Sequence, residues 1–191
     1  IEMLELFPEL EVIMVPIGGG GLISGVAIAA KSIKPGIKII GVQTTRFPSM
    51  FQSIQQLPIK CGKNSVAEGI AVKNPGSITL LIVHNFVDET LPVEEHENET
   101  AVLLLLEIEK TVVEGAGAVG LAALVNNPEL FSKRKVGLIL SGGNIDLITL
   151  SSIIQRGLVR TGRLARLRIV VPDVPGGLAK VTQILAKENA N

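Results

Sequence analysis

The stretch Val15-Pro16-Ile17-Gly18-Gly19-Gly20-Gly21-Leu22-Ile23-Ser24-Gly25 joins an apolar strand to an apolar helix through four consecutive glycines. Glycine has no Cβ, so successive backbone N–H groups can turn toward one anion. The N-terminus of the following helix adds unpaired donors and a partial positive charge. A plain structural turn needs fewer glycines, because each one costs backbone entropy. We therefore predict a site for a phosphate or another anion at these glycines.

The glycine spacing disfavours two familiar phosphate-binding loops. The dinucleotide fingerprint needs glycines at relative positions one, three and six, but Ile23 stands five residues after Gly18, and Ser24 stands five after Gly19. The nucleoside-triphosphate loop ends in Gly-Lys-Ser/Thr, which does not follow these glycines. No Gly-x-Ser-x-Gly elbow fits around Ser24 either. A nucleotide-binding oxidoreductase is therefore disfavoured.

Composition limits the classes of partner. The 191 residues include 18 basic and 18 acidic side chains, so no net charge draws the chain to nucleic acid or to an anionic membrane. The longest apolar runs, 101–106 and 116–125, fall well short of the ~20 residues that cross a bilayer. The single cysteine, Cys61, permits no internal disulfide, which fits a reducing compartment. We expect a cytoplasmic protein with a small-molecule partner, without nucleic acid or membrane.

Strand and helix patterns alternate as in an α/β protein with a doubly wound, mostly parallel sheet. Strands are predicted over 11–17, 37–42, 86–92 and 135–140, and helices over 22–34, 49–56, 76–84, 94–110, 115–127 and from about 145. The strand over 135–140 ends in Ser141-Gly142-Gly143-Asn144, and ligands of such sheets bind at the carboxyl ends of strands. Ser141 alone fits either a ligand contact or the N-cap of the next helix.

Four segments, in this order, resemble the motif set of the serine/threonine dehydratases, which are fold-type II pyridoxal-phosphate enzymes, and especially the threonine dehydratases (threonine ammonia-lyases). The segments are Pro16 to Leu22, Ala67-Glu68-Gly69, Val113 to Ala118 and Leu140 to Asp146. The resemblance covers most of residues 1–157 and corresponds to the C-terminal part of a catalytic region.

This resemblance implies pyridoxal 5'-phosphate as cofactor. Its phosphate would be held by Gly18, Gly19, Gly20 and Gly21 with the amide of Leu22, its pyridine nitrogen would face Ser141, and Glu114 would lie near the ring. An exposed glutamate at a helix end is the alternative for Glu114. The implied reaction is β-elimination from L-threonine, which yields 2-oxobutyrate and ammonia and fits amino-acid metabolism such as isoleucine biosynthesis.

Two features of the family are missing from this sequence. No lysine here has the setting of the Schiff-base lysine, which we expect upstream of Ile1, so we assign no catalytic residue to this chain and expect an inactive fragment. Related racemases and some dehydratases hold a divalent cation with carboxylates at the position of Gln43 and near Ser49. Both residues are neutral here, so we predict no metal site.

A change of composition after Ile154 divides the chain into a partial catalytic domain, 1–157, and a linker with a further domain start, 158–191. A predicted strand over 164–171 and a helix opened by Asp173-Val174-Pro175-Gly176-Gly177-Leu178 resemble the first β-α unit of an ACT domain, of ferredoxin type. That resemblance implies a homo-oligomer and allosteric control by an amino-acid effector, although an enzyme without an effector is equally open.

Two alternatives to a threonine dehydratase stay open from the sequence. One is a serine dehydratase or serine racemase of the same family, which the ACT-like segment disfavours. The other is a non-catalytic module that binds an anion and an effector. The cofactor lysine would separate the enzyme from the binding module.

Overall fold

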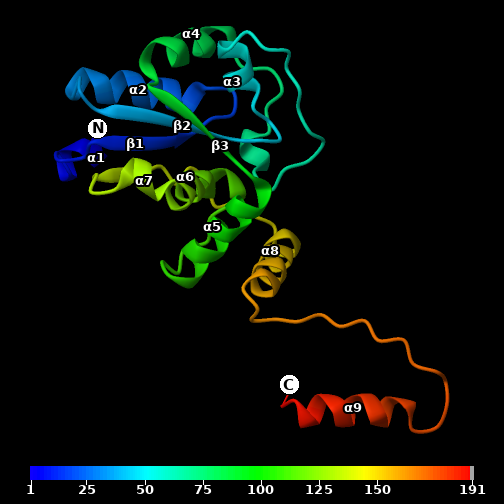
Figure 1. Ribbon diagram of the computed structural model, residues 1–191. Helices are drawn as coiled ribbons and strands as arrows, with labels where there is room; N and C mark the ends of the chain where they lie inside the picture. The colour runs from blue at the N-terminus through cyan, green and yellow to red at the C-terminus, as the bar shows by residue number, and fades with distance from the viewer. Residues whose placement is uncertain (190–191) are drawn as a thin grey trace. The chain divides into compact units, whose positions relative to one another are not determined.

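The computed structural model describes residues 1–189, which fall into two compact units, 1–157 and 158–189. The first unit is built on a four-stranded parallel sheet with the strand order β3-β2-β1-β4 (Figure 1). The strands are β1 (Val12–Pro16), β2 (Lys38–Thr44), β3 (Glu89–Val93) and β4 (Val136–Leu138). The predicted α/β class with a parallel sheet is confirmed.

Helices cover both faces of this sheet. Figure 1 shows α2, α3 and α4 above the strands and α5, α6 and α7 below them. The helices of the chain are α1 (Glu2–Leu6), α2 (Gly21–Ile33), α3 (Ser49–Ile54), α4 (Ser77–Phe86), α5 (Glu95–Glu107), α6 (Gly115–Asn126), α7 (Pro128–Phe131), α8 (Leu147–Arg160) and α9 (Gly177–Lys187), with the short 3-10 helix η1 (Glu68–Ile70). In the described part of the chain, no helix is long and apolar enough to cross a membrane.

The central strand β1 shows how the two layers form. Val12 and Met14 join the hydrophobic cluster with α5 and α6, whereas Ile13 and Val15 join the cluster with α2 and α4. Successive strand residues point to opposite faces, so an uninterrupted apolar strand can supply two cores at once. The buried run that the sequence displays before the glycines therefore places β1 in the middle of the sheet.

The sheet changes its winding direction between β1 and β4. Both strands are parallel and paired, with Met14 opposite Leu138. The chain leaves β1 through α2 on one face and reaches β4 through α5, α6 and α7 on the other. Connections that diverge in this way open a crevice at the carboxyl ends of the two strands. The glycine loop follows β1 and Ser141 follows β4, so both lie at this crevice.

The second unit contains α9, which begins at the predicted position. Gly176, the residue before the helix, has a φ of 82°, a left-handed conformation that suits glycine. The predicted strand over 164–171 is wrong: these residues are irregular. A strand needs a hydrogen-bonding neighbour, and no strand is described between residues 158 and 189. The ACT-like identity of 158–191 stays a prediction, and residues 190 and 191 lie outside the described part.

Candidate functional site

A cavity of about 280 Å³, which we call the glycine-loop cavity, lies at the carboxyl ends of β1 and β4. Its lining residues are Pro16, Gly18, Gly19, Gly20, Gly21, Leu22, Gly69, Ile70, Glu114, Ala116 and Ser141. Every site residue expected from the sequence is among them. The fold thus brings together four segments that are up to 125 residues apart, since Pro16 and Ser141 line the same space.

The four glycines of the loop fall into two kinds. A Cβ at Gly18 would lie 3.0 Å from a backbone atom of η1, and one at Gly20 would lie 2.5 Å from Cε of Met50. Gly20 also has a φ of 93°, in the left-handed region. A Cβ at Gly19 or Gly21 would meet no atom within 4 Å. Gly18 and Gly20 therefore let the loop pack closely against the protein. Gly19 and Gly21 lie on the side of the loop that no protein atom covers.

Backbone N–H groups dominate the donors of the cavity. Within the described residues, the amides from Gly18 to Leu22 donate to no protein acceptor. The helix α2 begins here without a side-chain cap, and α6 begins at Gly115 on the same cavity, also without one. No lysine or arginine lines this space. Unpaired amides and two helix N-termini are the features that suit a cavity to an anion held by backbone donors.

Glu114 is the acidic group of the cavity. It is half-buried at the N-cap of α6, and its amide donates to the carbonyl of Gly142 at 3.1 Å. A Cβ at Gly69 would lie 3.2 Å from its Oε1, and a Cβ at Gly142 would collide with the same carboxylate. Gly69 of η1 and Gly142 of the segment after β4 thus make room for this side chain. The exposed helix-end alternative for Glu114 does not match this position.

Ser141 lines the cavity and does not cap the following helix. Asp146 has that role, because its Oδ1 accepts the N–H groups of Ile148 and Thr149, each at 2.9 Å. Hydrogen bonds from the side chain and backbone of Thr149 lower the pKa of the Asp146 carboxyl. The N-cap interpretation of Ser141 is therefore wrong, because α8 begins at Leu147, six residues after it.

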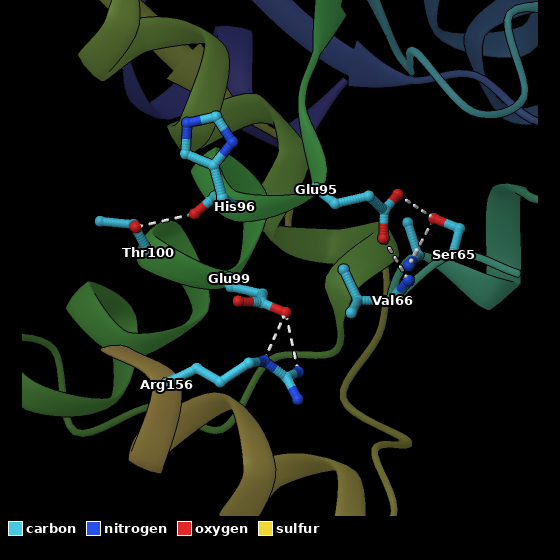
Figure 2. A network of polar contacts seen from close by, with 8 residues as sticks. Ser65, Val66, Glu95, His96, Glu99, Thr100 and Arg156 are labelled. Atoms are coloured by element: carbon cyan, nitrogen blue, oxygen red, sulfur yellow. Dashed lines mark hydrogen bonds and ion pairs between the residues drawn. The ribbon is translucent and has the colours of Figure 1, made fainter. Parts of the chain in front are cut away.

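A polar network on α5 fixes the segment that leads to Gly69. Figure 2 shows the carboxylate of Glu95 accepting the Ser65 hydroxyl at 2.6 Å and the Val66 amide at 2.8 Å. One turn further along α5, Glu99 forms an ion pair with Arg156 of α8 at 2.7 Å. The sequence alone does not reveal this network, because its partners are separated by about thirty residues or more and share no motif.

A larger cavity of about 480 Å³, the α5–α8 cavity, adjoins this network. It shares Glu114 with the glycine-loop cavity. Its lining is Arg46, Asn64, Ser65, Val66, Glu68, Glu95, Glu99, Glu114, Asn144, Ile145, Asp146, Ile148, Thr149, Ser152 and Arg156. Several of these groups are engaged with protein partners: Glu95 and Asp146 accept backbone amides, and Glu99 pairs with Arg156.

Gln43 and Ser49 both form hydrogen bonds with the protein. The Gln43 amide is buried and donates to the carbonyls of Ile17 and Phe47, both at 3.3 Å. The Ser49 hydroxyl donates to the carbonyl of Val72 at 2.6 Å. Among residues 1–189, no group of three or more His, Cys, Asp and Glu side chains is placed to hold a metal ion.

The model of the family described as "Pyridoxal-phosphate dependent enzyme" matches residues 1–142. An L-threonine ammonia-lyase from Thermotoga maritima is 47% identical over 193 aligned residues, which are 100% of this chain and 48% of that protein. The chain thus spans about half the length of the curated relatives it matches.

Two solved structures resemble the fold. The maize serine racemase has a TM-score of 0.70 and 37% identity, covering 81% of this chain and 50% of that one. The processed form of threonine deaminase isoform 2 from Solanum lycopersicum has a TM-score of 0.74 and 28% identity, covering 80% of this chain and 46% of that one.

Proposed function

Because this chain belongs to the family of pyridoxal-phosphate dependent enzymes, we propose that it forms the phosphate-binding half of the active site of an L-threonine ammonia-lyase. The enzyme would convert L-threonine to 2-oxobutyrate and ammonia. The observation that carries this proposal is the glycine-loop cavity, in which unpaired amides of Gly18 to Leu22 share one space with Ser141 and Glu114.

The phosphate end of pyridoxal phosphate suits the glycine loop. A phosphate is an anion with several acceptor oxygens, and the loop offers consecutive N–H groups at the start of a 13-residue helix. The open side of Gly19 and Gly21 leaves space that a side chain would fill. Bulky residues at either position would therefore occupy the place of the phosphate.

The ring end suits the far side of the same cavity. When bound, pyridoxal phosphate supplies an electron sink for the charge that develops when the substrate loses its α-proton. The Ser141 hydroxyl would donate a hydrogen bond to the ring nitrogen. It is too weak an acid to transfer its proton fully, which favours elimination over deeper carbanion chemistry. Glu114, held between two glycines, would act on protons near the ring.

No lysine is among the residues that line this cavity, so the lysine that removes the α-proton in this proposal would come from elsewhere in the enzyme. The relatives that match this chain are about twice its length, which leaves room for the cofactor lysine in the other half of the enzyme. We expect residues 1–191 alone to release no 2-oxo acid. The homo-oligomer, the amino-acid effector and the cytoplasmic location stay predictions.

The likeness to maize serine racemase supports a second candidate activity on L-serine. The closer agreement over the whole chain with an L-threonine ammonia-lyase favours threonine. The test uses the full-length protein that contains residues 1–191. It is incubated with pyridoxal phosphate and either L-threonine or L-serine. Release of 2-oxobutyrate from L-threonine supports the proposal. D-serine from L-serine without 2-oxobutyrate would support the racemase, and no turnover of either would leave an anion-binding module.

A further inference from the structure

The glycine loop is held from behind by a side chain of α4. The hydroxyl of Thr79 donates to the carbonyl of Gly19 at 2.6 Å, across 60 residues of sequence. It also lies 3.0 Å from the carbonyl of Gly76. A hydroxyl has one proton, so the shorter contact identifies Gly19 as its main acceptor. The amide of Gly76 approaches the same Gly19 carbonyl at 3.3 Å.

The fixed carbonyl of Gly19 determines where the next amide points. In a planar trans peptide the C=O of one residue and the N–H of the next point in opposite directions. Holding the Gly19 carbonyl against α4 therefore turns the Gly20 N–H away from α4. That amide has no protein acceptor among the described residues, and Gly20 lines the glycine-loop cavity.

A second side chain, that of Gln43, also holds a carbonyl group of the loop. The buried amide of Gln43 donates to the carbonyl of Ile17, the residue before the glycines. By the same peptide geometry this contact turns the N–H of Gly18 away from Gln43. Alternate carbonyls of the loop, at Ile17 and Gly19, are thus fixed by side chains from β2 and α4.

We propose that Thr79 is a positioning residue that orients the Gly19–Gly20 peptide so that its N–H faces the phosphate. Glycine peptides rotate readily, so a run of four glycines does not by itself aim its amides. The Thr79 hydroxyl supplies a constraint from α4, with a contact to the Gly19 carbonyl that is shorter than that of the Gly76 amide. This role rests on the proposed function only for the identity of the phosphate, since any phosphate in the cavity would depend on the same peptide.

The test compares Thr79→Val, which keeps the shape and removes the hydroxyl, with Thr79→Ser, which keeps the hydroxyl. Thr100→Val is the matched control, because Thr100 donates to the carbonyl of His96 on α5 and does not line the glycine-loop cavity. The variants are made in the full-length protein that contains residues 1–191. Dissociation constants are measured for pyridoxal phosphate, for pyridoxal without its phosphate, and for inorganic phosphate by phosphorus NMR.

We expect Thr79→Val to weaken pyridoxal phosphate and inorganic phosphate about tenfold, the effect of one positioned hydrogen bond at the upper end of its usual range. Thr79→Ser should restore both affinities, and binding of pyridoxal should not change. Equal weakening of pyridoxal and pyridoxal phosphate would overturn the proposal, because it would indicate general damage. The proposal would also be overturned if Thr79→Val bound phosphate as tightly as Thr100→Val does. Failure of Thr79→Ser to restore phosphate binding would overturn it as well.

A replacement variant and a further comparison of ligands complete the test. Should Thr79→Val not fold, Thr79→Cys replaces it, because a thiol of similar size is a much weaker donor. Its phosphate binding is expected to be weaker than that of the serine variant, and equal binding would contradict the role of the hydroxyl. Phosphate binding that depends on Thr79 in a protein without affinity for pyridoxal phosphate would support the positioning role and overturn the proposed function.

Discussion

Replacement of Gly20 by alanine tests how the loop is built. The backbone at Gly20 has φ 93° and ψ −2°, and a left-handed conformation costs an L-residue about 1–2 kcal/mol. The new methyl group would also lie 2.5 Å from Cε of Met50 and 2.8 Å from Cβ of Thr79. Overpacking of this kind costs about 1–3 kcal/mol. We therefore expect Gly20→Ala to lower the free energy of unfolding by about 2–5 kcal/mol.

The matched control is Gly25→Ala on the same helix. Gly25 is exposed within α2, and a Cβ there would meet no atom within 4 Å. This change should raise the free energy of unfolding by about 0.5–1 kcal/mol, because alanine loses less entropy in a helix. Urea denaturation of both variants measures the difference. The reasoning is refuted if Gly20→Ala unfolds at the same urea concentration as the wild type or as Gly25→Ala.

Three more predictions concern the surroundings of the site. Asn98 is fully buried on α5, and neither Nδ2 nor Oδ1 of its side chain has a hydrogen-bond partner among the described residues. Asn98→Leu should therefore raise the free energy of unfolding by about 1–3 kcal/mol in urea denaturation. A lower free energy of unfolding would contradict this. Glu95→Gln removes one of the two acceptors that hold Ser65 and Val66, so binding of pyridoxal phosphate in a spectroscopic titration should weaken severalfold, with unchanged affinity as the opposing result. Hydrogen bonds from Thr149 lower the pKa of Asp146 below its ordinary 3.8, so its charge adds stability that is complete above about pH 4 and is lost as the pH falls through the lowered pKa. Asp146→Asn should therefore flatten the acid end of the curve of stability against pH, and an unchanged curve would exclude this role.

The sequence predicted the frame of the site well. The apolar run before the glycines is long enough to read as a buried strand, and it forms β1 with a cluster on each face. The motif segments around Gly18 and Ser141 follow the neighbouring strands β1 and β4, and Glu114 lies at the start of α6, so all three line one cavity. Each of these segments contains glycines, which are needed where the backbone must turn or approach another group closely. Their order and spacing can therefore be recognised in the sequence without the fold.

One prediction, the strand over 164–171, failed because it depended on a long-range partner, and one of the two interpretations of Ser141 is excluded by a local contact. Residues 164–171 alternate like a strand, but a strand forms only beside another, and residues 158–189 contain none. Ser141 has the chemistry of an N-cap, but Asp146 lies closer to the first turn of α8 and takes both amides.

The contacts that aim the glycine loop were not visible in the sequence. Thr79 lies 60 residues from Gly19, and Gln43 lies 26 residues from Ile17. Neither is part of a recognisable motif, and a threonine near a helix start is ordinary. Only the packing of α4 and β2 behind the loop brings their donors to its carbonyls.

The most direct test of the central claim is a crystal structure of the encoded polypeptide with pyridoxal phosphate bound. The account predicts phosphate oxygens within hydrogen-bonding distance of the amides from Gly18 to Leu22, and the ring nitrogen beside the hydroxyl of Ser141. Pyridoxal phosphate bound in the α5–α8 cavity, with its phosphate on Arg46 or Arg156, would contradict it.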